Sequence, residues 1–214
     1  MIKQGEVMVD GKVITSPALN INGSNSVKVG SKKITQIPEV KLWVYYKPTG
    51  LITTHNDPQN RPTIFQTLAD KLQRVISVGR LDLNSEGLLL LTNSGELSRY
   101  FESPANKIER VYKVRVFGKR PPDVSLENEK ITIDGMTYRP KSIKLTKKGA
   151  SNSWYDVVLT EGKNREIRRI FEYFGLEVSR LIRTKFGGYS LGDMKPGEYK
   201  EVKIDENYCR QVQK

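Results

Sequence analysis

One short segment holds side chains that could carry out nucleophilic or acid–base chemistry. Residues 79–87 read Gly-Arg-Leu-Asp-Leu-Asn-Ser-Glu-Gly, which places Asp82 close to Arg80 between two glycines. The mainly apolar runs 75–78 and 88–91 on either side indicate two buried strands joined by an exposed connection. A carboxylate held among basic groups stays ionised and can act as a nucleophile. From the spacing alone, a structural turn in which Asp82 pairs with Arg80 is the commoner explanation.

A tyrosine further along the chain is a second candidate. Tyr112 lies in a segment whose apolar and charged residues alternate, as they do in a half-buried strand. It shares its parity with Val114 and Val116, so the three side chains should point to one face. A core tyrosine whose hydroxyl group finds a partner is the commoner explanation of such a position.

Residues 164–174 have the spacing of an amphipathic helix. At about 100° per residue the apolar side chains gather on one side and three arginines gather on the other. In the ordinary explanation this charged face is solvated, and Arg168 forms an i,i+4 pair with Glu172. Alternatively, one arginine turns inward and fixes the carboxylate of Asp82, because a guanidinium fork holds a carboxylate in a fixed geometry.

Taken together and in this order, the segments resemble the bacterial ribosomal-RNA pseudouridine synthases of the RsuA-like family. The resemblance begins at about Lys41 and covers most of the chain after it. It rests on Gly79-Arg80-Leu81-Asp82 with residues 87–93, on Arg110-Val111-Tyr112-Lys113-Val114, on residues 161–169, on Leu181-Ile182-Arg183 and on residues 195–199.

The resemblance implies an isomerase that acts on the bond between ribose C1′ and the base of a uridine. Asp82 would be the catalytic aspartate, attacking the sugar or promoting elimination, after which the freed uracil turns and rejoins through carbon. Tyr112 would stack on the base, and Arg168 would pair with Asp82. The implied substrate is ribosomal RNA, that of the large subunit (23S), free or in an assembly intermediate. The substrate-binding residues would be Arg80, Leu81, Lys163, Asn164, Arg165, Arg169, Leu181 and Arg183.

Composition agrees with a polyanionic partner. The 214 residues carry a formal net charge of +12, which favours nucleic acid through attraction and counterion release. A basic surface without that role is the plainer alternative.

The sequence contains neither a signal-peptide pattern nor an apolar run of membrane-spanning length, so we expect a cytoplasmic protein and no membrane partner. One cysteine and one histidine, Cys209 and His55, cannot build a structural zinc site. An isomerisation also needs no redox cofactor, nucleotide or metal, and a monomer is the default.

Alternating segments with turn signals and a few helical spacings predict an α+β fold with a mixed, largely antiparallel sheet flanked by helices. We expect two parts, residues 1–38 and the catalytic domain 39–214, with the boundary near Pro38. Residues 1–38 resemble the second half of the S-four RNA-binding domain, in which two helices normally precede the segment that matches residues 5–12. Either this module is truncated or the natural start lies upstream.

Two other functions fit parts of the pattern. A catalytically silent RNA-binding or ribosome-assembly protein could keep the same fold. A hydrolase of the glycosidic bond could use the same carboxylate, and it would release free uracil where an isomerase releases none.

Overall fold

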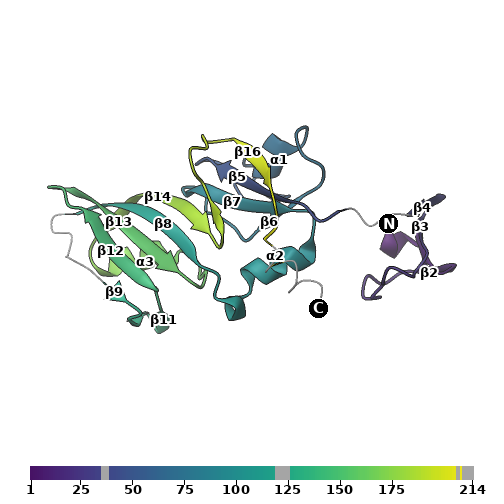
Figure 1. Ribbon diagram of the computed structural model, residues 1–214, viewed down its shortest axis with the longest axis horizontal. Coiled ribbons are helices and arrows are strands. Elements are labelled where there is room, and N and C mark those ends of the chain that lie inside the picture. Colours follow the sequence, from purple (N-terminus) through teal and green to yellow (C-terminus); the bar gives the residue numbers. More distant parts are fainter. Residues whose placement is uncertain (35–38, 119–125, 206–207, 209–214) are drawn as a thin grey trace. The chain divides into compact units, whose positions relative to one another are not determined.

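Two units of structure follow one another along the chain, Met1–Val40 and Lys41–Lys214 (Figure 1). The computed structural model describes residues 1–34, 39–118, 126–205 and Tyr208. Pro38, near which the sequence predicts the boundary, and Cys209 lie outside the described residues.

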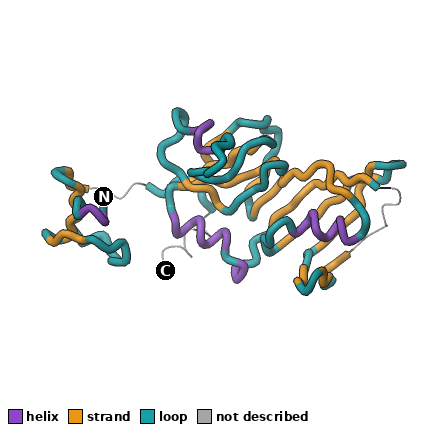
Figure 2. Tube along the Cα trace, turned by 180° about the vertical axis from the view of Figure 1, so that it is seen from behind, coloured by secondary structure: helices purple, strands orange, loops and turns teal. Residues whose placement is uncertain are grey.

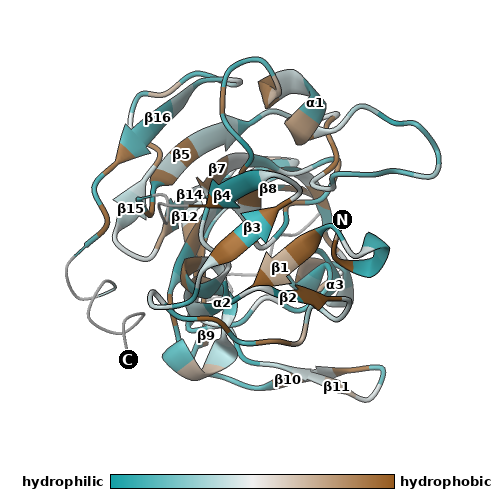
Figure 3. Cartoon of the chain, turned by 90° about the vertical axis from the view of Figure 1, so that its right-hand side faces the viewer, coloured by the Kyte–Doolittle hydropathy of each residue, from teal (hydrophilic) through white to brown (hydrophobic). Residues whose placement is uncertain are grey.

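The first unit is a small sheet. It contains the short 3-10 helix η1 (Ile2–Gln4) and the strands β1 (Val7–Val9), β2 (Lys12–Ile14), β3 (Val27–Val29) and β4 (Lys32–Ile34). The strand order is β2-β1-β3-β4, and all pairs are antiparallel. Strand β3 alternates between apolar and polar residues, whereas β4 is mainly hydrophilic (Figure 3). Among the described residues of this unit only Val7 and Val9 are buried, so it has little core of its own.

The second unit is built on a ten-stranded sheet in the order β16-β5-β7-β14-β8-β13-β12-β9, with β6 paired to β7 and β15 paired to β14. In the described part of the sheet, β7 and β14 form the one parallel pair, so the predicted mixed, largely antiparallel sheet is confirmed. The strands are β5 (Leu42–Lys47), β6 (Ile76–Val78), β7 (Glu86–Thr92), β8 (Arg110–Phe117), β9 (Leu126–Glu127), β12 (Ser142–Lys147), β13 (Asn152–Leu159), β14 (Glu177–Phe186), β15 (Tyr189–Ser190) and β16 (Tyr199–Val202).

Helices and one hairpin cover this sheet. The helices are α1 (Ile64–Leu68), α2 (Gly95–Glu102), η2 (Pro104–Asn106) and α3 (Glu166–Tyr173), and the hairpin is β10 (Ile131–Ile133) with β11 (Met136–Tyr138). Helix α2 is capped by Ser94, whose side chain accepts a hydrogen bond from the Leu97 N–H. Helix α3 lies along the half of the sheet that contains β14, as Figure 2 shows.

The run of four leucines in β7 is explained by burial on both of its faces. Leu89 and Leu91 belong to one hydrophobic cluster, together with Ile167 of α3. Leu88 and Leu90 belong to a second cluster, on the side that α2 covers. A strand buried on both faces is apolar throughout and does not alternate. The loop between β6 and β7, which contains Asp82, is thereby fixed by a rigid strand at each end.

Candidate active site

A cavity of about 620 Å³ opens beside the loop that joins β6 to β7. Every site residue predicted from the sequence lines it except Arg169, which instead donates a hydrogen bond of 3.2 Å to the Tyr138 hydroxyl group. Four stretches that are distant in the sequence therefore meet in one cavity. The predicted residues that line it are Arg80, Leu81, Asp82, Tyr112, Lys163, Asn164, Arg165, Arg168, Leu181 and Arg183.

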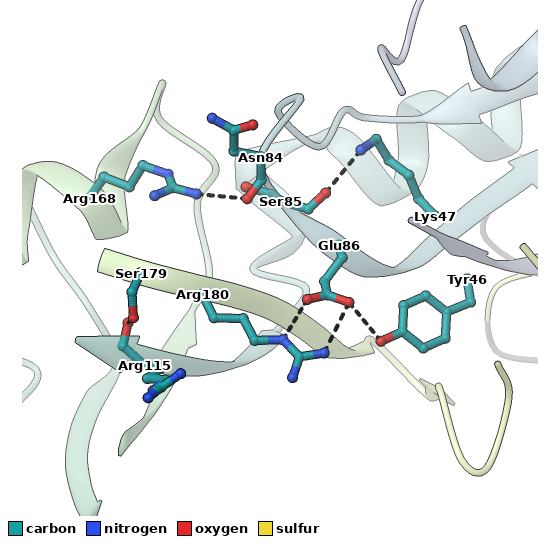
Figure 4. A network of polar contacts seen from close by, with 9 residues as sticks. All are labelled: Tyr46, Lys47, Asn84, Ser85, Glu86, Arg115, Arg168, Ser179 and Arg180. Atoms are coloured by element: carbon teal, nitrogen blue, oxygen red, sulfur yellow. Dashed lines mark hydrogen bonds and ion pairs between the residues drawn. The ribbon is translucent and has the colours of Figure 1, made fainter. Parts of the chain in front are cut away.

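The main chain around Asp82 is held by a buried lysine. Nζ of Lys47, at the end of β5, donates hydrogen bonds to the carbonyl oxygens of Pro48 at 3.0 Å and Asp82 at 3.1 Å. It also donates to the carbonyl oxygen of Ser85 at 2.9 Å (Figure 4). Burial lowers the pKa of Lys47 to about 8, against the opposing effect of the negative charges of Asp82 and Glu86. The side chain of Asp82 itself is exposed, so it is available to a substrate.

Sequence reasoning did not assign Lys47 to the site. A signal was present, because this lysine directly follows the apolar run Leu42–Tyr46 of a buried strand. A charge in such a place is rarely buried unless it is paired. In this chain the partners are carbonyl oxygens of the loop that contains Asp82.

A second polar network fixes the first residue of β7. The buried carboxylate of Glu86 accepts hydrogen bonds from the Tyr46 hydroxyl group at 3.0 Å and from Arg180 Nε at 2.6 Å (Figure 4). Burial raises the pKa of Glu86, but the hydrogen bonds from Arg180 and Tyr46 outweigh it and leave the pKa below its usual value. This network ties β7 to β5 and β14 just after the loop.

Arg168 contacts the loop in a different way from the predicted one. Its Nη1 donates to the carbonyl oxygen of Val178 and its Nη2 to that of Asn84, both at 2.9 Å. Among the ion pairs of the described residues there is none between Arg168 and Asp82. The main-chain carbonyl of Asn84 accepts a hydrogen bond from the guanidinium group, whereas the exposed Asp82 side chain lines the same cavity without an ion pair to it. Burial and the charge of Arg165 lower the pKa of Arg168, and the charge of Asp82 raises it.

Tyr112 and two buried arginines form the inner wall. Tyr112 lies on the same buried face as Val114 and pairs in register with Arg183 of β14. Nε of Arg183 donates to the carbonyl oxygen of Leu88 at 2.7 Å, and its guanidinium group lies 4.9 Å from the centre of the Phe186 ring. Arg110, which sequence reasoning did not assign to the site, lies 4.7 Å from the same ring centre. Arg110 has the same strand parity as the buried residues of β8, and this pattern in the sequence could have indicated that it is buried.

The N-terminal end of α3 contributes a buried acid that sequence reasoning also missed. Oε2 of Glu166 accepts a hydrogen bond from the Lys163 backbone N–H at 3.2 Å. The Lys163 ammonium group contacts the Glu161 carboxylate at 2.7 Å and the Thr137 carbonyl oxygen at 2.6 Å. Burial, followed by the charge of Glu161, raises the pKa of Glu166 to about 7. Asn164 and Arg165 are exposed, so they form the rim of the cavity.

Neither a metal cluster nor a membrane-spanning helix is present in the described part of the chain. No three His, Cys, Asp or Glu side chains there are grouped so that they could hold a metal ion. None of the described helices is long and apolar enough to cross a bilayer. The cavity combines an accessible carboxylate with buried cations and apolar walls, which suits a polar, planar group attached to an anionic backbone.

Comparisons with known proteins agree with the geometry. A family model described as RNA pseudouridylate synthase matches residues 41–173. An uncharacterized RNA pseudouridine synthase of Rickettsia felis is 56% identical over 202 residues, which cover 94% of this chain and 88% of the relative. Ribosomal large subunit pseudouridine synthase B of Haemophilus influenzae is 38% identical over 99% of this chain and 62% of its own length. A crystal structure of a pseudouridylate synthase matches 99% of this chain and 89% of its own with a TM-score of 0.67 at 27% identity.

Proposed function

Since the chain belongs to the RNA pseudouridylate synthase family, we propose that it isomerises a specific uridine of large-subunit (23S) ribosomal RNA to pseudouridine. The comparisons confirm the family that the sequence resembles. What we propose is the RNA on which the enzyme acts. It is supported by the relative from Haemophilus influenzae, whose name refers to the large ribosomal subunit, and by the net charge of +12. The substrate is this RNA, free or within an assembly intermediate, and the enzyme acts as a cytoplasmic monomer.

The observation that carries the proposal is the placement of Asp82. Its exposed carboxylate lies at a cavity that Tyr112 and Leu181 also line, while its main chain is fixed by Lys47. Holding a reacting group in one geometry supplies much of the rate enhancement of an enzyme. Asp82 is the catalytic aspartate, which attacks C1′ or promotes elimination there.

The reaction rearranges one nucleoside. The C1′–N1 bond breaks, a C1′–C5 bond forms, and the proton on C5 is replaced by one on N1. Because no electrons are gained or lost, the reaction needs no redox cofactor, and we propose that the enzyme uses neither a nucleotide cofactor nor a metal. The cavity has to keep the freed uracil while it turns, and the side chains of Tyr112 and Leu181 form apolar walls for that purpose.

The target uridine has to leave its stack to reach Asp82, because the glycosidic bond of a stacked base is not accessible. The exposed side chains of Arg80, Asn164 and Arg165 are placed at the rim to contact RNA phosphates, and Arg169 lies further along α3. RNA shape and unpaired bases supply the specificity. Residues 1–38 form a partial S-four-like RNA-binding module, and residues 39–214 form the catalytic domain.

The experiment is pseudouridine mapping by carbodiimide-dependent reverse-transcription stops on bacterial 23S ribosomal RNA. Free RNA and large-subunit precursor particles are each treated with the wild type, with Asp82→Asn and with Asp70→Asn. Asp70 is also exposed and lies outside the cavity, so it controls for the substitution itself. We expect one new stop with the wild type and Asp70→Asn, and none with Asp82→Asn.

Other outcomes identify other functions. Product from Asp82→Asn would contradict the assignment of the catalytic residue. RNA binding without product in any sample would indicate a catalytically silent binder. Release of free uracil would indicate a hydrolase of the glycosidic bond.

A further inference from the structure

Three buried side-chain atoms in the described part of the chain have no hydrogen-bond partner. They are Oε1 of Glu166, Nε of Arg168 and Nη2 of Arg183. All three residues line the cavity that contains Asp82. Because buried polar atoms nearly always have a partner, their concentration in one cavity indicates that a ligand completes them.

Each of these side chains is already fixed through its other polar atoms. Glu166 is held at Oε2 by the Lys163 backbone N–H, Arg183 at Nε by the Leu88 carbonyl oxygen, and Arg168 at both Nη atoms. Glu166 and Arg183 are each only 3% exposed. The three free atoms are therefore held in place before a ligand arrives, which lowers the cost of binding one.

The set consists of two donors and one acceptor. The N–H groups of the two arginines can only donate, and the carboxylate oxygen of Glu166 accepts. A uracil ring offers the opposite set, with two carbonyl oxygens that accept and one N3–H that donates. Cytosine has no hydrogen on N3, and its N3 lone pair would face the carboxylate.

We propose that Glu166 is the residue that recognises the target base, by accepting a hydrogen bond from uracil N3–H at Oε1. This inference rests on the proposed function, and it adds a determinant of base identity to that site. A buried polar group made to bind one substrate atom rejects an analogue that lacks this atom, because the group would then stay unpaired.

The charges around Glu166 agree with an acceptor that awaits a donor. The nearby carboxylate of Glu161 can share a hydrogen bond with Glu166 only when Glu166 is protonated, and it is already bound by Lys163, so it does not satisfy an ionised Glu166. The positive charge of Arg110 lies close enough to interact with Glu166. A donor supplied by the ligand would stabilise the ionised form.

The test removes the uracil N3–H group and the Glu166 carboxylate, first separately and then together. Two RNA fragments that span the mapped uridine are synthesised, both with tritium on C5 of that uridine and one with a methyl group on its N3. Single-turnover release of tritium is measured for the wild type, for Glu166→Ala and for Glu172→Ala. Glu172 lies on the same helix and is exposed, so it is the matched control.

We expect N3-methylation to slow the wild type and Glu172→Ala on the order of tenfold to a hundredfold, as the loss of a hydrogen bond to a charged group does. The same methylation should slow Glu166→Ala by only a few-fold, because the partner is already gone. If N3-methylation slowed the wild type and Glu166→Ala equally, the proposal would be overturned. It would also be overturned if methylation did not slow the wild type.

Two controls keep the outcomes separate. If Glu166→Ala does not fold by circular dichroism, Glu166→Leu replaces it, since it keeps most of the side-chain volume and buries no charge. Tritium release by the wild type from unmodified RNA tests the proposed function by itself. Complete absence of tritium release would contradict that function. Release that N3-methylation slows equally in the wild type and in Glu166→Ala would contradict only the role of Glu166.

Discussion

Lys47 donates a hydrogen bond of 3.1 Å from Nζ to the backbone carbonyl oxygen of Asp82, so that a fully buried side chain fixes the main chain of an exposed one. The same ammonium group also binds the carbonyl oxygens of Pro48 and Ser85. The loop between β6 and β7 is therefore held from inside the protein. This arrangement leaves the carboxylate of Asp82 free for the substrate.

Replacing this lysine should affect catalysis more than binding. We expect Lys47→Met to lower single-turnover pseudouridine formation on the order of a hundredfold, because a loop displaced by about 1 Å misplaces the carboxylate of Asp82. RNA affinity, measured by filter binding, should change by only a few-fold. Lys41→Met is the control, because Lys41 is only half-buried and pairs with Glu201 at the other end of β5. Wild-type turnover in Lys47→Met would show that the loop does not need this anchor.

Local sequence patterns predicted the frame of the site well. The strands beside residues 79–87, the face to which Tyr112 points and the amphipathic helix with Ile167 on its apolar side all follow from spacing alone, and the structure has them. Their side-chain directions are fixed by the strand and helix periods, which a short window of sequence contains.

Contacts between distant segments were less predictable. The hydrogen bond from Lys47 to Asp82 spans 35 residues, and the one from Arg168 to the Asn84 carbonyl oxygen spans 84. Every residue has a main-chain carbonyl, so no sequence pattern marks the one that a guanidinium group will bind. The family resemblance implied that Arg168 pairs with Asp82, and no local pattern pointed to the Asn84 carbonyl oxygen instead. Glu166 was missed because its burial depends on how α3 packs against distant segments such as β10 and β14.

Gly87 permits the close approach of β7 and β14. A Cβ atom at this position would lie 2.3 Å from the Arg183 carbonyl oxygen, and the backbone φ is +104°. We expect Gly87→Ala to lower the free energy of unfolding by about 3 kcal/mol or more, because the clash involves main-chain atoms that cannot move aside. Urea denaturation measures this change.

Gly79→Ala separates the clash from backbone strain. Gly79 has a φ of +66°, and a Cβ atom there would meet nothing within 4 Å. Its substitution should cost only about 1–2 kcal/mol of left-handed backbone strain. Equal losses in the two variants would show that the parallel pair tolerates a side chain.

The guanidinium group of Arg168 joins α3 to two other segments, and a lysine cannot replace it. We expect Arg168→Lys to lower kcat/KM on the order of tenfold or more, because one ammonium group lacks the planar fork that binds the Val178 and Asn84 carbonyl oxygens together. Arg99→Lys, an exposed position on α2 outside the cavity, should leave kcat/KM unchanged. An Arg168→Lys enzyme as active as Arg99→Lys would exclude a need for the double contact.

Glu166 should make the stability of the protein depend on pH. Burial and the charge of Glu161 raise its pKa from 4.5 to about 7, so the folded state binds the proton more tightly than the unfolded state does. Its contribution to stability is therefore fully present below about pH 4.5 and is lost as the pH rises through about 7. The difference between the two pKa values corresponds to roughly 3 kcal/mol.

Glu166→Gln removes this titration while it keeps the size of the side chain. We expect the free energy of unfolding of the wild type, relative to that of Glu166→Gln, to fall by roughly 3 kcal/mol between about pH 4.5 and about pH 8. Urea denaturation at several pH values in this range measures the difference. The exposed Glu172→Gln should follow the wild type at every pH. A constant difference between the wild type and Glu166→Gln would mean that Glu166 has the same pKa in the folded and the unfolded state, and that its carboxylate is satisfied by the protein itself.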